Sequence, residues 1–355
     1  MNFELIFKLS LFVSGSLFSL AVLLTAGLMI SKIVRRGWAR YTSSREEIYK
    51  APILHAISSE SNAVLELLFR HKRRWGDWKI VEHSLLKWAQ GLRGYGHQKL
   101  CEIFDQNGFA DYEIRNLKSI RWWVRARAAQ RLGQMLCVRA SSPLIGTLQD
   151  HSLEVRLMAS WALGRLKDPK AVDPIVQSLA HYSKLAALRA TNIILTMGHR
   201  TVPILEGLLQ NPDRDVQVLA IDLLGVLKER QATDQLIPFL NAKNLDTRVA
   251  ACRALGNIED EKAGPSVARC LQDPAWQVRS KAAFVVGQLG YVQAIPDLKR
   301  TMGDKFWWVR LHSGEALSRL GGQGQKALQE TLSSEDRFAR DMAAQWLDEL
   351  AASNL

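Results

Sequence analysis

Cysteine is scarce in this chain, with four residues in 355, far apart and without a Cys-x-x-Cys pair. This usage suits a reducing compartment and argues against a disulfide framework or a zinc site. No His-Glu dipeptide occurs, the eight histidines are scattered, and the glycine-rich stretch Gly321–Gly324 is interpreted as a turn between helices. Because no nucleophile, base and orienting group share a recognisable spacing, we expect no catalytic residues, no metal, no cofactor and no small-molecule substrate.

Positive charge is concentrated in one part of the chain. The formal net charge is +12; residues 32–140 hold 21 lysines and arginines against 10 acids, whereas residues 141–355 hold 25 against 24. A nucleic-acid-binding protein would more naturally spread its basic residues along its length. A basic cluster beside an apolar segment suits anionic lipid headgroups. The charge pattern therefore argues against nucleic acid as a partner and favours anionic membrane lipids.

The apolar segment Leu9–Ser31 has 23 residues without a charge. About 20 apolar residues, rising 1.5 Å each, cross a hydrocarbon core of roughly 30 Å. Basic residues follow the segment, and by the positive-inside rule this side lies in the cytoplasm. A cleaved signal peptide is the competing interpretation. We predict an uncleaved, single-pass anchor in the inner (cytoplasmic) membrane of a bacterium, with the remainder of the chain facing the cytoplasm.

Eight basic residues near this segment are predicted to face lipid: Lys32, Arg35, Arg36, Arg40, Arg70, Lys72, Arg73 and Arg74. Basic residues near an anionic surface gain on the order of 1 kcal/mol each. For the run from Arg70 to Trp75, binding to RNA and a solvated helix end are the alternatives to lipid contact.

A 31-residue period is the strongest internal signal. Valines, or one threonine, recur at multiples of 31 residues: Val124, Val155, Val216, Thr247, Val278 and Val309. An arginine usually follows directly, a small residue stands four positions on, and a glycine nine positions on is expected to end the helix. The repeat near Leu188 is two residues out of register. Spacings of four and eight place these residues on one face of an α-helix, and the small residue lets helices approach closely.

Each repeat continues into a second helix that begins near a proline, which the first turn of a helix tolerates. Two helices in about 31 residues cannot bury their own apolar face, so the units must stack. The predicted fold is all-α, an α-solenoid with one N-terminal transmembrane helix. We predict an anchor with its basic flank (1–40), a basic helical module of degenerate repeats (41–117), and the solenoid with a C-terminal cap (118–355).

An acid often stands six residues before the arginine, as in Asp150/Arg156, Asp273/Arg279 and Asp304/Arg310. We interpret these pairs as an arginine ladder that bridges neighbouring turns, because repetition in register is what stacking demands. A row of ligand-binding residues is the alternative.

Two sets of residues are candidates for binding a partner. Trp122, Trp276 and Trp307 share a repeat position that a leucine fills elsewhere, which indicates packing between repeats, while Trp123 and Trp308 are predicted exposed contact residues. If the second helices line the concave face, the polar residues predicted to dock a partner are Gln177, Gln210, Asn241, Arg269, Lys299 and Arg300.

The motif Val-Arg-x-x-Ala-Ala-x-x-Val-Gly at residues 278–287 resembles HEAT repeats, and more narrowly the short HEAT-like repeats of phycobilin lyases. The resemblance covers roughly residues 118–350 and implies the fold, since the same repeats serve many functions. Deoxyhypusine hydroxylase resembles this repeat, but its diiron centre is held by adjacent His-Glu pairs, which are absent here. The anchor and the basic module depart from the phycobilin lyases.

Residues 99–135 are similar to HEAT proteins encoded in bacterial operons beside membrane glycosyltransferases and exopolysaccharide machinery. This resemblance implies a membrane-tethered interaction scaffold, or a regulatory subunit of an inner-membrane complex for polysaccharide synthesis or export, and not an enzyme. Its expected partner is an integral membrane enzyme or transporter. The alternative is a chaperone- or lyase-like solenoid that acts on a cofactor-bearing client protein.

Overall fold

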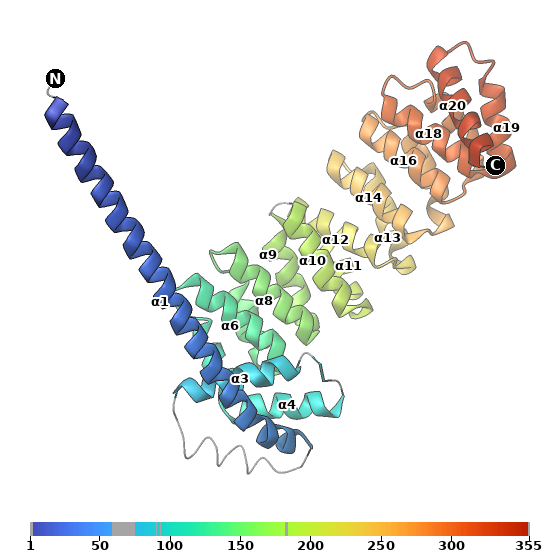
Figure 1. Cartoon of the computed structure of the whole chain (residues 1–355). Helices are drawn as coiled ribbons and strands as arrows, with labels where there is room; N and C mark the ends of the chain where they lie inside the picture. The colour runs from blue at the N-terminus through green and yellow to red at the C-terminus, as the bar shows by residue number, and fades with distance from the viewer. Residues whose placement is uncertain (1–2, 59–74, 90, 93, 182–183, 354–355) are drawn as a thin grey trace. The chain divides into compact units, whose positions relative to one another are not determined.

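The computed structural model describes residues 3–58, 75–89, 91–92, 94–181 and 184–353 (Figure 1). These residues form α-helices and short 3-10 helices and no strand, which confirms the all-α prediction. The chain divides into two compact units, Met1–Tyr112 and Glu113–Leu355.

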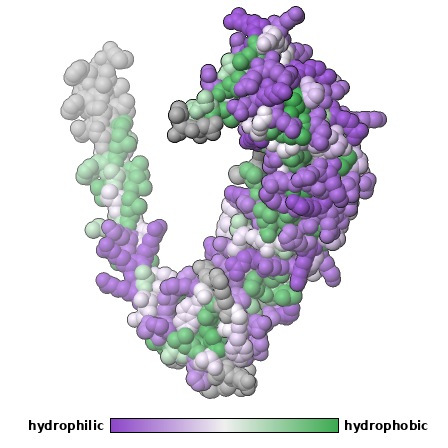
Figure 2. Space-filling model, turned by 90° about the vertical axis from the view of Figure 1, so that its right-hand side faces the viewer, coloured by the Kyte–Doolittle hydropathy of each residue, from purple (hydrophilic) through white to green (hydrophobic). Residues whose placement is uncertain are grey.

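The first unit begins with one long helix, α1 (Phe3–Ser58). Its 56 residues extend about 84 Å at 1.5 Å each. The helix continues past the predicted end of the apolar segment at Ser31, through the basic flank, to a packed end where Tyr49 and Ile53 are buried. A window within residues 15–55 is long and apolar enough to cross a membrane and is not covered by the rest of the protein; near an N-terminus, a signal sequence has the same properties. Figure 2 shows this hydrophobic stretch and the hydrophilic stretch that follows it.

Three shorter helices complete this region: α3 (Trp75–Ala89), α4 (Tyr95–Gln106) and α5 (Phe109–Asn116). Helix α1 packs against α3 and α4. The Trp78 ring stacks on Phe109 with 4.5 Å between centroids, and Phe104 meets Phe109 edge-on at 6.1 Å. Such aromatic contacts bury large apolar area, so they hold the short helices together.

The second unit is a succession of helical hairpins (Figure 1). The first helices of the repeats are α6 (Trp122–Met135), α8 (Leu153–Leu166), α10 (Lys184–Met197), α12 (Arg214–Val226), α14 (Leu245–Ile258), α16 (Trp276–Gln288), α18 (Trp307–Arg319) and α20 (Arg337–Ser353). The second helices are α7 (Ser141–Thr147), α9 (Val172–Ala180), α11 (Val202–Leu208), α13 (Thr233–Leu236), α15 (Gly264–Arg269), α17 (Ile295–Thr301) and α19 (Gly321–Thr331). Short 3-10 helices precede or extend most second helices: η1 (Val138–Ala140), η2 (Pro169–Ala171), η3 (His199–Thr201), η4 (Arg230–Ala232), η5 (Ile237–Asn241), η6 (Glu261–Ala263), η7 (Cys270–Gln272) and η8 (Val292–Ala294).

In the regular repeats the repeated glycine lies inside the first helix, so the prediction that it ends the helix is wrong there. In the irregular repeat the prediction is confirmed, because Gly198, with a φ of 75°, directly follows the end of α10 at Met197. A Cβ atom on Gly225 would lie 2.5 Å from the Cα of Ala254 in the next repeat, and one on Gly287 would lie 2.6 Å from the Cα of Ala316. At these two positions the first helices therefore approach one another backbone to backbone, and glycine is required for that spacing. The Gly321–Gly324 stretch is also helical and forms the start of α19.

The predicted arginine ladder is present, but its side-chain partners are not those six residues before. Arg279 donates to the carboxylate of Asp304, 25 residues ahead, from Nε at 2.7 Å and Nη2 at 3.1 Å. Its Nη1 donates to the backbone carbonyl of Asp273 at 2.8 Å. Arg125 with Asp150 and Arg248 with Asp273 form equivalent pairs. Each aspartate therefore joins the arginines of two successive repeats, one through its side chain and one through its backbone.

The ladder is interrupted in the middle of the array. His181 stands 25 residues after Arg156, where other repeats place an aspartate. Two repeats after Arg156, Gln217 stands at the arginine position and donates to the carbonyl of Leu209 at 2.8 Å, while Ala242 stands at the aspartate position. The ion pairs therefore form one block before this interval and another after it.

Acidification is expected to weaken both blocks. The hydrogen bond from Arg125 lowers the pKa of Asp150 below its usual value. Burial raises the pKa of Asp304, but hydrogen bonds from Arg279 and from the Phe306 N–H outweigh it and leave this pKa lowered too. With lowered pKa values in the folded state, the unfolded chain binds protons first. The stabilisation is therefore complete above the ordinary aspartate pKa of about 3.9 and is lost as pH falls through the folded values.

Thermal melting followed by circular dichroism between pH 6 and pH 2 measures this loss. In a variant carrying both Asp150→Asn and Asp304→Asn, the fall in melting temperature on acidification should be smaller than in the wild type. An equal fall would show that other carboxyl groups cause it.

Candidate functional site

The six polar residues predicted to dock a partner lie one after another along the second helices or directly after them, as a row and not as a cluster. Five are exposed and Lys299 is half-buried. Lys299 pairs with Glu330 at 2.8 Å, and Arg300 pairs with Asp297 at 2.8 Å. The remaining members are Gln177, Gln210, Asn241 and Arg269. Their role in docking stays a prediction.

The tryptophans at the starts of α6 and α18 are all exposed. Trp123 and Trp308, the predicted contact residues, are 48% and 50% exposed. Trp122 and Trp307 are each 48% exposed, so the prediction that they pack between repeats is wrong. Both are the first residue of their helix, beyond the face that packs against neighbours.

Trp276 and Ile120 differ from these four tryptophans in opposite ways: Trp276 packs against the next repeat, and Ile120 is almost fully exposed. Trp276 packs between repeats as predicted, because its ring stacks on that of Phe306 at the start of the next repeat with 5.3 Å between centroids. Sequence reasoning missed Ile120, which is 99% exposed and stands two residues before Trp122. An apolar residue in the turn before a helix was the available signal.

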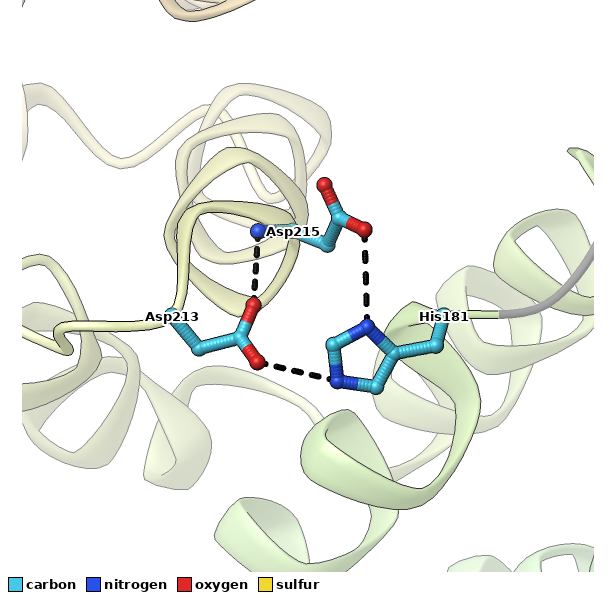
Figure 3. A group of neighbouring side chains, drawn as sticks. All are labelled: His181, Asp213 and Asp215. Atoms are coloured by element: carbon cyan, nitrogen blue, oxygen red, sulfur yellow. Dashed lines mark hydrogen bonds and ion pairs between the residues drawn. The ribbon is translucent and has the colours of Figure 1, made fainter.

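His181 joins two aspartates at the interruption of the ladder (Figure 3). Its Nε2 lies 2.9 Å from Asp213 Oδ2, and its Nδ1 lies 3.4 Å from Asp215 Oδ2. Asp213 also caps α12 by accepting from the backbone N–H of Asp215 at 2.9 Å. The three side chains are types that bind metal ions, with ligand atoms within 4.8 Å of one another. The two ring nitrogens face different carboxylates, so the three side chains form a polar link between repeats.

A family model describes most of the second unit. The model for HEAT repeats matches residues 115–191, 201–276 and 267–348, more than half of the chain. This chain belongs to the HEAT-repeat family. The predicted solenoid of HEAT-like repeats is thereby confirmed, and the 31-residue period is the spacing of its HEAT units.

Solved structures resemble this HEAT protein at low identity, and no curated protein matches its sequence. Human deoxyhypusine hydroxylase in complex with glycerol is 22% identical, with 87% of this chain and 98% of that chain covered and a TM-score of 0.31. The complex of CpcE and CpcF of phycocyanin lyase from Nostoc sp. PCC7120 is 22% identical, with 68% and 94% covered and a TM-score of 0.30. An engineered protein is 17% identical, with 87% and 95% covered and a TM-score of 0.37. These likenesses carry no argument about activity.

The basic flank of the HEAT protein's long helix forms a stripe. Lys32, Arg36 and Arg40 are four residues apart, which places them on one face of α1, and Arg35 lies beside them. All four are exposed. Trp38 and Tyr41 are on the same stretch, with ring centroids 5.7 Å apart. The other four basic residues predicted to face lipid, Arg70, Lys72, Arg73 and Arg74, lie outside the described residues.

Proposed function

We propose that this HEAT protein is a membrane-tethered scaffold or regulatory subunit that binds an integral membrane enzyme or transporter through its repeats. The observation that carries the proposal is the continuity of α1. One unbroken helix joins an exposed apolar stretch to an end packed by Tyr49 and Ile53. A helix of this kind ties a folded unit to a bilayer without a flexible linker, and HEAT solenoids offer long surfaces for proteins.

The proposed location is the inner membrane, with the repeats in the cytoplasm. The exposed basic stripe of α1, from Lys32 to Arg40, follows the apolar stretch directly. Basic residues concentrate on the cytoplasmic side of membrane spans, and Trp38 and Tyr41 suit the headgroup level. The stripe would contact anionic lipids there. Synthesis or export of a polysaccharide is the process we propose for the complex.

Binding, and not catalysis, is the proposed role of the solenoid. The aspartates of the ladder are each held by an arginine, and Asp213 caps a helix. These carboxylates therefore have structural partners, and we propose that any chemistry belongs to the bound membrane protein.

A pull-down from native membranes in mild detergent tests the proposal. The full chain should recover a membrane enzyme or transporter in about equal amount. A chain lacking residues 1–40 keeps the packed end of α1; it should appear in the soluble fraction and still recover the same partner from detergent extracts. The mass of the membrane-extracted chain should equal that of the whole sequence, because a cleaved signal peptide would shorten it.

Recovery of only a soluble, cofactor-bearing client would favour the chaperone- or lyase-like alternative. Recovery of no partner, even after crosslinking, would remove the support for a scaffold.

A further inference from the structure

Phe284 on α16 lies close to two cations. The Lys281 Nζ is 5.4 Å from the centre of its ring, and the Arg319 Cζ is 4.9 Å from it. The His312 ring meets Phe284 with 5.6 Å between centroids, and Trp308 lies 6.0 Å from His312. These side chains come from the first helices α16 and α18, so two successive repeats build one cationic and aromatic surface.

The two arginines at this surface already have carboxylate partners. Arg253 on α14 holds Asp222 from Nε at 3.0 Å and from Nη2 at 2.7 Å. Arg319 holds Glu315 at 2.7 Å. After these pairs are formed, the positive charge that remains is on Lys281.

Lys281 is half-buried, and no carboxylate of the described residues lies within ion-pairing distance of it. Burial lowers the pKa of Lys281, and the neighbouring Arg253 lowers it further, whereas the Cys252 thiol acts in the opposite direction. A partly desolvated ammonium without a carboxylate partner is unfavourable until an anion reaches it. The site is therefore arranged to accept one negative charge.

The groups around Lys281 limit what that anion can be. Burial lowers the pKa of His312, and the ring accepts or donates a hydrogen bond with Ser280 at 2.8 Å, so it contributes little positive charge near neutral pH. One unpaired cation is too few for nucleic acid or a lipid surface, whose binding needs several. Trp308, half-exposed, and Phe284 supply apolar area instead.

We propose that the surface formed by Arg253, Lys281, Phe284, Trp308 and His312 binds an acidic peptide segment of the partner protein. Lys281 takes one carboxylate, and an apolar side chain next to it packs on Phe284 and Trp308. This inference rests on the proposed scaffold function and names the chemistry of the segment that the scaffold binds.

Selection from a phage library of random octapeptides tests it, with the full chain immobilised in mild detergent. Peptides recovered on the wild type should be enriched at least about threefold in Asp or Glu next to an apolar residue, a factor well above sampling noise and equal to roughly 0.7 kcal/mol at 1.4 kcal/mol per tenfold. Lys281→Met keeps the length of the side chain and removes its charge, so the enrichment should disappear. Lys326→Met, on the exposed face of α19, is the matched control and should retain it.

Absence of acidic enrichment on the wild type, or enrichment that survives Lys281→Met, would overturn the inference. So would Lys281-dependent binding of inorganic polyphosphate or of phosphatidylglycerol vesicles without any peptide preference. If the pull-down recovers a membrane partner equally with wild type and Lys281→Met, the scaffold function stands and the acidic-peptide inference fails. Loss of the partner from the wild type itself would instead contradict the scaffold function.

Discussion

Replacing Asp273 by alanine is expected to destabilise the packing of α14 on α16 by about 3 kcal/mol. The Asp273 carboxylate accepts from Arg248 Nε at 2.8 Å and Nη2 at 3.0 Å, and from the Ala275 N–H at 2.8 Å. The side chains of Arg248 and Asp273 are only 13% and 9% exposed. Alanine would leave a largely buried guanidinium without its carboxylate, which costs far more than losing an exposed pair.

Hydrogen exchange measured by mass spectrometry is the suitable readout, because a solenoid opens locally and not all at once. Protection of amides in α14 and α16 should fall roughly 100-fold, since 1.4 kcal/mol corresponds to a factor of ten. Glu330→Ala is the control. It removes the pair with Lys299, which joins neighbouring repeats at 2.8 Å with side chains 34% and 52% exposed, and should leave protection nearly unchanged. Similar effects of the two variants would contradict a structural role for the ladder.

Substituting Gly225 by alanine should destabilise the contact between α12 and α14 by about 2 kcal/mol. The added Cβ would lie 2.5 Å from the Cα and 2.7 Å from the Cβ of Ala254, so two backbones must move apart. The expected loss appears as faster exchange in both helices and as a lower melting temperature.

The same substitution at Gly207 is the matched control. Gly207 lies in α11, where a Cβ would meet no atom within 4 Å. Alanine is favoured over glycine inside a helix by up to about 1 kcal/mol, so Gly207→Ala should stabilise the chain. Effects of opposite sign would show that close approach of helices, and not helix propensity, sets the need for glycine at the repeat position. Two losses of equal size would show the reverse.

The fold could be predicted from the sequence because the period of the sequence is also the period of the packing. A residue at a fixed position in each repeat meets the same surroundings, so the recurrence of valines such as Val155 and Val278 predicts that they are buried. The carboxylate that Arg279 binds could not be predicted, since Asp273 and Asp304 both lie close by and only the stacking of repeats decides. Gly225 was misread for the same reason, because its close neighbour is in the next repeat.

The candidate binding surfaces were less accessible to sequence reasoning. The pair Asp222–Arg253 is separated by 31 residues, and a search for opposite charges at that spacing would have found it. The lack of a carboxylate near Lys281 could not be predicted in this way, because it depends on the positions of all the side chains that surround Lys281 in the folded protein. The exposure of Trp122 and Trp307 depends on where their helices begin, a boundary that periodicity leaves uncertain by a residue or two.

The interruption of the ladder has a mechanical consequence for a chain held in a membrane and pulled by a partner. Elements in series carry the same tension, and the most compliant element takes most of the extension. The blocks cross-linked by Arg125–Asp150 and by Arg248–Asp273–Arg279–Asp304 resist shear between repeats. The interval from His181 to Ala242 has the exposed contacts of His181 in their place. We therefore expect the repeats between His181 and Ala242 to separate first under tension, while the two blocks of ion pairs keep their packing.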